Sequence, residues 1–254
     1  MRGLLADGWL RAEHSVLVVA GGAADRDALM AAGVRSATIT NVDDRMPDEG
    51  YPPYRWSRQD AERLDYADSS FDVCLVHQAL HHCRSPHRAL GEMYRVARRG
   101  IVVFEPHETL MSRLGVRLGV GQRYELAAVA ANDVHRGGVQ NTDVPNFVYR
   151  WTEREVYKTL AAYDPAGSPR VRFRYDLREP GEGAARLRRG PSATLARVVV
   201  PVARAVLRLM PSQANAIAIV ADKLGRRDLH PWLVWGSSGP TADAAWFDAH
   251  GREE

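Results

Sequence analysis

The N-terminal part of the chain contains a short apolar run that leads directly into two glycines. Residues 16–20 read VLVVA, and Gly21 and Gly22 follow. A run of this kind is typical of a strand buried in a parallel sheet. The two glycines let the backbone turn sharply and approach a ligand closely, and the alanine-rich residues 23–32 favour a helix. A strand, a glycine turn and a helix N-terminus in this order form the start of a Rossmann-like nucleotide site. Because the spacing G-x-G-x-x-G is absent, the turn of an α/β protein without a nucleotide fits this segment equally well.

Apolar runs and helical patterns alternate along most of the chain, as expected of βαβ units. We therefore predict an α/β fold with a mostly parallel sheet. The expected strands are residues 16–20, 37–42, 71–77, 101–104, 171–175 and 216–221, and the expected helices are residues 25–32, 86–97 and one that opens at Thr152. Residues 44–56 are rich in proline and are expected to form a loop.

Composition excludes several classes of protein. The 254 residues are enough for one large α/β domain, alone or with an appended subdomain. Basic residues (34) and acidic residues (31) nearly balance, which argues against a nucleic-acid partner. Cys74 and Cys83 are too few for a disulfide framework. A cytoplasmic location is therefore expected. Residues 1–10 lack a long apolar core, and no signal peptide is recognised there.

An aspartate lies where the second predicted strand ends. Asp43 comes 21 positions after Gly22. In a Rossmann-like sheet, a carboxylate at this place accepts hydrogen bonds from the two ribose hydroxyls of a nucleotide. Acidic residues are also common in turns, but we favour a role in ligand binding.

Two longer blocks resemble a known family. Residues 60–72 read DAERLDYADSSFD, and residues 81–100 read HHCRSPHRALGEMYRVARRG. They are similar to the D-x-x-x-L-P-F-x-D-x-S-F-D and L-x-H-x-x-x-P-x-x-A-L-x-E-x-x-R-V-L-K-P-G-G blocks of class I S-adenosylmethionine-dependent methyltransferases, in the small-molecule branch. The resemblance covers about residues 14–106. It implies a Rossmann-like, seven-stranded, mostly parallel sheet with helices on both faces, and S-adenosyl-L-methionine as the cofactor.

The resemblance also implies roles for single residues. The turn formed by Ala20, Gly21 and Gly22 would face the methionine part of the cofactor, and Asp43 would bind its ribose. The remaining contacts would come from Asp60 and the backbone of Ala61, which would hold the adenine amino group, and from His77, which would lie near the amino-acid part and the sulfonium.

The first strand and its turn depart from the family pattern. Val18 stands where the family usually has an acidic residue, and Ala20 and Ala24 replace the outer glycines. These departures favour a non-catalytic, methyltransferase-like scaffold or partner subunit. Asp43 and Asp60 favour an enzyme more strongly, because a decayed site has no need to keep both acceptors at working spacing.

The expected activity is O-methylation of a sugar, a glycan intermediate or a secondary metabolite, with N-methylation of a small molecule as the near alternative. A hydroxyl acceptor needs a base, and histidine titrates near neutral pH. Our first choice is His135, because Gly137 and Gly138 make its loop mobile enough to close over an acceptor. His81 is the second choice, and Glu105, at the end of a predicted strand, is another candidate.

Four residues of the region expected to form a lid are candidates for a divalent metal such as Mg²⁺. They are Asp133, His135, Asn141 and Asp143. Carboxylate, amide and imidazole groups are common metal ligands, but their spacing matches no recognised metal signature. No metal ligand is therefore assigned.

Residues 195–210 form an amphipathic pattern. Arg197, Arg204 and Arg208 fall on one helical face and apolar residues on the other. We expect a helix packed on the domain, with contact to a membrane surface or to a second copy in a homodimer as the alternatives. The small-molecule or glycan acceptor is the other expected partner.

The expected domain organisation has two parts. Residues 1–224 would form the methyltransferase domain, with a lid and acceptor region over about 107–150. An inserted amphipathic, helical segment over about 184–212 would precede the last strand. Residues 225–254 would form a C-terminal tail, partly disordered from His230 onward.

Overall fold

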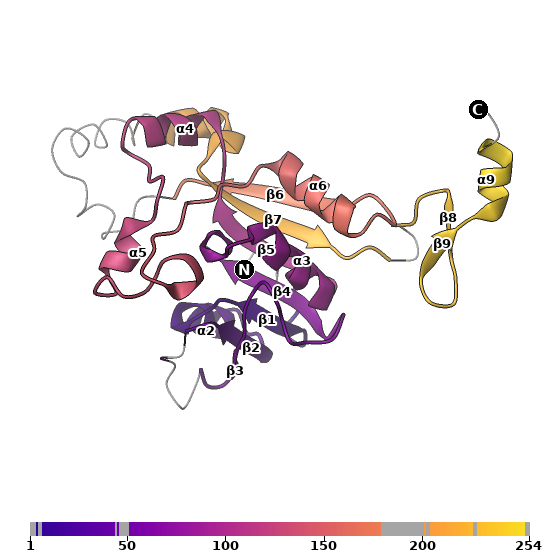
Figure 1. Ribbon diagram of the computed structural model, residues 1–254, viewed down its shortest axis with the longest axis horizontal. Coiled ribbons are helices and arrows are strands. Elements are labelled where there is room, and N and C mark those ends of the chain that lie inside the picture. The colour runs from indigo at the N-terminus through magenta and orange to yellow at the C-terminus, as the bar shows by residue number, and fades with distance from the viewer. Residues whose placement is uncertain are drawn as a thin grey trace.

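A computed structural model describes residues 4, 7–43, 45, 51–178, 201, 204–225 and 228–251. Seven strands form one sheet in the order β3-β2-β1-β4-β5-β7-β6 (Figure 1). Their bounds are β1 Ser15–Val19, β2 Ser36–Asn41, β3 Arg55–Arg58, β4 Phe71–His77, β5 Ala97–Pro106, β6 Arg170–Asp176 and β7 Ala216–Asp222. The first five strands are parallel, and β7 runs antiparallel to both β5 and β6. The predicted Rossmann-like, seven-stranded sheet is confirmed.

Helices cover both faces of this sheet. The α-helices are α2 Ala23–Ala31, α3 Pro86–Val96, α4 Leu110–Arg117, α5 Leu126–Ala130, α6 Glu153–Tyr163 and α9 Ala244–His250, and the 3-10 helices are η1 Leu80–His82, η2 Val139–Asn141 and η3 Pro211–Gln213. Leu17 and Val19 of β1 join the core under α3 and α6, whereas Val16 and Val18 join the core that contains Leu29 of α2. Both faces of this central strand are therefore buried, which explains its uninterrupted apolar sequence.

The ends of two helices follow the expected capping chemistry. The hydroxyl of Ser85 accepts a hydrogen bond from the Arg88 N–H at the start of α3. Thr152 does the same for the Glu155 N–H at the start of α6. Both caps satisfy a helix N–H that would otherwise have no partner.

The prediction that residues 44–56 form a loop is wrong for the last two of these residues. Arg55 and Trp56 begin strand β3, which pairs in parallel with β2 so that Arg55 lies opposite Thr38. The strand sequence, RWSR, has no apolar alternation, because β3 is a short strand at the edge of the sheet with little buried surface.

The C-terminal tail is folded within residues 228–251, so the expectation of partial disorder from His230 is wrong there. Strands β8 (Leu233–Trp235) and β9 (Pro240–Ala242) form a hairpin, and α9 follows. The hairpin and α9 project away from the sheet (Figure 1). Stacked aromatic rings hold this arm together, among them those of His230 and Trp232, whose centroids are 4.3 Å apart.

Only part of the inserted segment can be described. Residues 204–209 are helical, as expected for the end of the amphipathic pattern, whereas 184–200, 202 and 203 lie outside the described residues. Within the described part of the chain, no helix combines the length and the apolar character needed to cross a membrane.

Candidate active site

The glycine turn after β1 forms at the carboxyl edge of the sheet. The Gly21 N–H donates to the carbonyl of Thr40, 2.8 Å away. A Cβ at Gly21 would lie 2.5 Å from Val18 Cγ1, so only glycine fits there. Ala20, by contrast, carries a side chain at φ 51°, in the left-handed region. Such a conformation costs an L-residue about 1 kcal/mol or more, and glycine would adopt it without strain.

Asn41, at the end of β2, ties this turn to two other loops. Its Nδ2 donates to the carbonyl of Gly21 at 3.1 Å, and its Oδ1 accepts from the Asp43 N–H at 3.0 Å. Its backbone carbonyl accepts from the Gln59 N–H at 3.0 Å. The structure thus brings the glycine turn and the loops that carry Asp43 and Asp60 together at one edge. We did not single out Asn41 from the sequence, where a polar residue closing an apolar strand was its only signal.

The carboxylate of Asp43 is already paired. Its Oδ2 lies 2.7 Å from Arg45 Nη2, and Arg136 approaches its other oxygen at 3.5 Å. Hydrogen bonds from Arg45 lower the pKa of Asp43 to about 2 although burial raises it. Asp43 is therefore a charged acceptor, and a ribose that binds it must compete with two arginines.

The next loop presents Asp60 and Ala61. Asp60 Oδ1 accepts from the Glu62 N–H at 2.9 Å, and Ala61 is buried. His77 ends β4, where its exposed side chain packs edge-on against Phe104 with ring centroids 5.8 Å apart. Carboxylates at Asp43 and Asp60 suit the donor groups of ribose and adenine, and the tight turn at Gly21 suits a close backbone approach. These residues fit S-adenosylmethionine.

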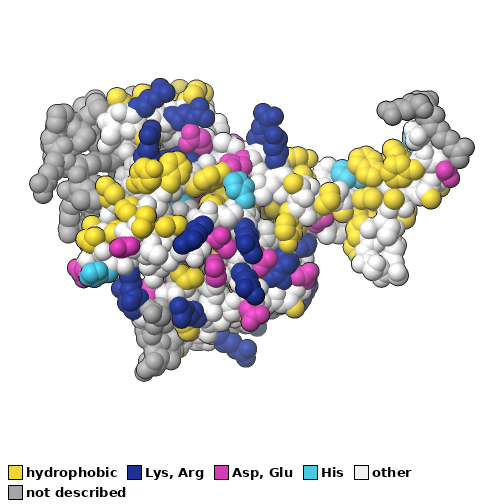
Figure 2. Space-filling view, in the orientation of Figure 1, with side chains coloured by type: hydrophobic (Ala, Val, Ile, Leu, Met, Phe, Trp, Pro, Cys, Tyr) yellow, Lys and Arg dark blue, Asp and Glu magenta, His cyan; other side chains and the backbone are white. Residues whose placement is uncertain are grey.

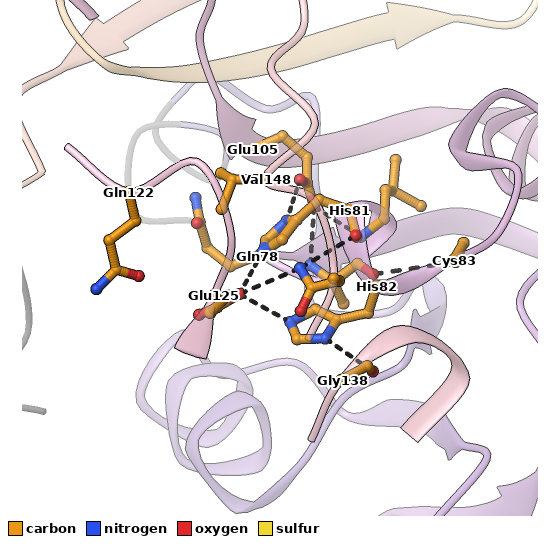
Figure 3. Close-up of polar contacts among 12 residues, drawn as sticks. Gln78, His81, His82, Cys83, Glu105, Gln122, Glu125, Gly138 and Val148 are labelled. Atoms are coloured by element: carbon orange, nitrogen blue, oxygen red, sulfur yellow. Dashed lines mark hydrogen bonds and ion pairs between the residues drawn. The ribbon is translucent and has the colours of Figure 1, made fainter. Parts of the chain in front are cut away.

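A buried carboxylate organises the loop after β4. Glu105, at the end of β5, is fully buried. Its Oε1 accepts from the N–H groups of Ala79 and Leu80 at 2.8 Å each, and its Oε2 lies 2.7 Å from His81 Nδ1 (Figure 3). Glu105 therefore fixes both the loop and the orientation of the His81 ring. His81 and Glu105, two of the three catalytic candidates chosen from the sequence, are therefore in direct contact.

A second carboxylate closes the other side of His81. Glu125, which precedes α5, places Oε2 3.1 Å from His81 Nε2 and 3.2 Å from His82 Nε2. Figure 3 shows both rings turned toward it. Asn146 Nδ2 donates to the His81 carbonyl at 3.2 Å and lies 3.4 Å from Glu125 Oε2. Glu125 and Asn146 were not identified from the sequence. The one available signal was that Glu125 is the sole acid between residues 109 and 132.

The charges of this cluster are interdependent. Burial lowers the pKa of His81, but Glu105 and Glu125 outweigh that effect and raise it to about 9. Burial raises the pKa of Glu125, but hydrogen bonds from His81 and His82 outweigh it and hold the value well below its usual range. In this arrangement the imidazolium of His81 therefore lies between two carboxylates at neutral pH.

The structure places His135 elsewhere. Its side chain is exposed, and its backbone N–H donates to the carbonyl of Asn132 at 3.1 Å. Neither His135 nor the other lid residues proposed as metal ligands form a metal-sized group within the described residues. The one such group is His81, His82 and Glu125, with ligand atoms within 4.8 Å, a spacing that their hydrogen bonds explain. The metal candidates of the lid are thus not brought together.

Comparison with known proteins gives matches at three levels. Residues 22–104, about a third of the chain, match the family described as "Methyltransferase domain". A malonyl-[acyl-carrier protein] O-methyltransferase of Pectobacterium atrosepticum is 45% identical over 49 residues, which is 19% of this chain and 19% of that relative. The chain thus matches about a fifth of the relative's length.

Solved structures resemble nearly the whole chain. The YcgJ protein of Bacillus subtilis has a TM-score of 0.54 at 16% identity, over 88% of this chain and 98% of its own. An S-adenosylmethionine-dependent methyltransferase of Archaeoglobus fulgidus has a TM-score of 0.51 at 14% identity, over 88% and 95%. The [4+2]-cyclase SpnF has a TM-score of 0.51 at 17% identity, over 87% and 79%. At these identities the likeness shows the fold alone, and a fold hosts several chemistries.

Proposed function

We propose that this chain is a class I S-adenosylmethionine-dependent methyltransferase that methylates a hydroxyl group on a sugar, a glycan intermediate or another small metabolite. S-adenosylmethionine, when bound, supplies a methyl group activated by a positively charged sulfur. We assign its methionine part to Ala20, Gly21, Gly22 and His77. Its ribose is assigned to Asp43, and its adenine to Asp60 and Ala61.

The observation that carries the choice of a hydroxyl acceptor is the pair of His81 and Glu105. A hydroxyl must lose its proton as the methyl group arrives, whereas an amine can lose it beforehand. A histidine oriented by a buried carboxylate is suited to accept that proton. His81 Nδ1 is held by Glu105 at 2.7 Å, so Nε2 is the atom that would receive it. The relative from Pectobacterium atrosepticum is itself named an O-methyltransferase, which supports transfer to oxygen rather than to nitrogen.

Glu125 must leave His81 Nε2 before that atom can accept a proton. The two carboxylates keep His81 protonated near neutral pH, because its pKa is raised to about 9. If Glu125 moves away, one stabilising charge is lost and the pKa of His81 falls. Glu125 lies in the expected lid region at the start of α5. We propose that the acceptor hydroxyl takes its place beside Nε2 when it binds.

Two measurements test the proposal. Titration with S-adenosylhomocysteine by calorimetry should show one binding site. Methyl transfer should then be assayed on a panel of hydroxylated sugars and metabolites, with amines as the alternative acceptors. Transfer to amines alone would contradict O-methylation, and absence of binding would contradict the enzyme itself.

A non-catalytic role is the second candidate, and two observations favour it. Ala20 is strained at φ 51° and Asp43 is already paired with Arg45. A chain that has lost its cofactor would show such features. The same titration separates the two functions, because a scaffold subunit would not bind S-adenosylhomocysteine.

A further inference from the structure

Helix α4 exposes an apolar stripe. Leu110, Leu114 and Leu118 are 72%, 49% and 39% exposed. They lie four residues apart, so they share one face of the helix. Ser112, on the opposite side, is buried and bonds with Thr109 at the helix start. The polar start of the helix is thus buried, whereas these three leucines are exposed.

A second exposed apolar group lies next to α4. Leu209 and Met210 are 86% and 53% exposed. Leu209 ends the helical stretch 204–209 and Met210 follows it. The 3-10 helix η3 joins this stretch to α4, because the Thr109 hydroxyl donates to the Gln213 carbonyl at 3.1 Å. Figure 1 shows the two helices beside each other. We call the group formed by Leu110, Leu114, Leu118, Leu209 and Met210 the α4 surface.

The charges around the α4 surface are mostly positive. Arg113 and Arg117 flank the leucine stripe of α4, and Arg208 precedes Leu209. Within the described residues 109–124 and 204–215 there are five arginines and no aspartate or glutamate. Glu108, just before this range, pairs with Arg113 at 2.7 Å. Figure 2 shows basic and hydrophobic side chains adjoining in this region.

We propose that the α4 surface docks on a membrane that contains anionic lipids. Apolar side chains bordered by arginines are the composition that binds a lipid interface, where the leucines enter the acyl boundary and the arginines meet phosphate groups. Several exposed leucines on one helix face suit the fluid acyl boundary of a membrane. An acidic carrier protein would match the arginines but would leave the leucine stripe unexplained.

The position of the α4 surface links docking to the proposed reaction. Helix α4 begins five residues after Glu105, at the sheet edge that carries His81. Docking would therefore turn the acceptor side of the site toward the membrane. An acceptor with a lipid anchor would meet the site there. This link depends on the proposed function, but the docking does not.

Flotation of the full chain with vesicles tests the docking. The protein should float with phosphatidylcholine vesicles that contain phosphatidylglycerol, several-fold more than with phosphatidylcholine alone, and salt should weaken the binding. The triple variant L110S/L114S/L118S and the double variant R117E/R208E should each lose most of it. Matched controls are M30S/V234S, which changes exposed apolar residues elsewhere, and R154E/K158E on α6, which makes the same charge change.

The outcomes are distinct. Absence of binding to anionic vesicles, or binding that both α4-surface variants retain, would overturn the proposal. So would light scattering that shows a dimer converted to a monomer by the leucine variant, because a second copy would then cover the surface. If the leucine variant does not fold, the arginine variant decides. Methyl transfer is measured separately on soluble acceptors, so its failure would not affect the docking result.

Discussion

His81 Nδ1 lies 2.7 Å from Glu105 Oε2, and both side chains are buried. Glu105 also accepts two backbone N–H groups of the loop that carries His81. The carboxylate therefore has two tasks, which are to hold the loop and to orient the ring. A substitution that keeps its shape but removes its charge separates them.

Glu105→Gln should lower kcat by roughly 100- to 10,000-fold, because the ring of His81 loses the charge that stabilises its protonated form. The amide oxygen still accepts from the loop, so the affinity for S-adenosylhomocysteine should change little. Steady-state kinetics and calorimetry measure the two effects. Glu155→Gln is the matched control, since it makes the same change in another carboxylate that pairs with a histidine, His87, at 2.9 Å, and it should leave kcat unchanged. Equal kcat losses in both variants would contradict the role of Glu105.

Two histidines compete for the role of base. His81→Asn should lower kcat by about 100-fold or more while cofactor affinity stays nearly constant, because His81 is the histidine that Glu105 orients. His135→Ala should have a smaller effect, because that side chain is exposed and away from the cluster. Single-turnover assays with a common acceptor compare the variants. A larger loss of kcat in His135→Ala than in His81→Asn would instead support His135 as the base, brought to the acceptor by closure of the lid.

The pKa of His81 predicts how stability changes with pH. The pKa is raised from 6.5 to about 9 in the folded chain, where Glu105 and Glu125 outweigh the effect of burial. The stability that this group contributes is therefore fully present below pH 6.5 and is lost as the pH rises through 9. Denaturant titrations over this window should show the free energy of unfolding falling by about 1 kcal/mol or more. In Glu125→Gln the fall should be smaller, because one raising charge is gone, and an unchanged slope would show that Glu125 does not act on His81.

The sequence predicted the centre of the fold better than its edge. Strand β4 was placed at residues 71–77, with the bounds that the structure has, because its buried centre, residues 73–76, is continuously apolar. The edge strand β3 buries little and has no such pattern. In the site, His81 and Glu105 were found by their positions at strand ends. Glu125 and Asn146 were missed because their contacts with His81 span 44 and 65 residues of chain, and no local pattern encodes such a contact.

Asp43→Ala should weaken the binding of S-adenosylhomocysteine by roughly 10- to 100-fold, because the ribose hydroxyls lose a charged acceptor in a partly closed site. The loss of affinity should not be larger, because Arg45 and Arg136 already pair with the Asp43 carboxylate and compete with the ribose for it. Calorimetry gives the dissociation constant. Asp27→Ala is a suitable control, because that exposed aspartate pairs with Arg26 on α2. An unchanged constant in Asp43→Ala would refute the ribose assignment.

Ala20→Gly tests the least typical position of the glycine turn. The residue has φ 51°, a conformation that glycine adopts without a clash. Relief of this strain should stabilise the variant by about 1 kcal/mol. The greater freedom of a glycine in the unfolded chain offsets part of that gain. Affinity for S-adenosylhomocysteine should stay equal or rise, because the turn keeps its shape. Gly21→Ala should do the opposite, since its Cβ would lie 2.5 Å from Val18 Cγ1. Denaturant melts and calorimetry on both variants measure the pair. A destabilised Ala20→Gly with weaker binding would mean that the methyl group of Ala20 makes contacts worth more than the strain it causes.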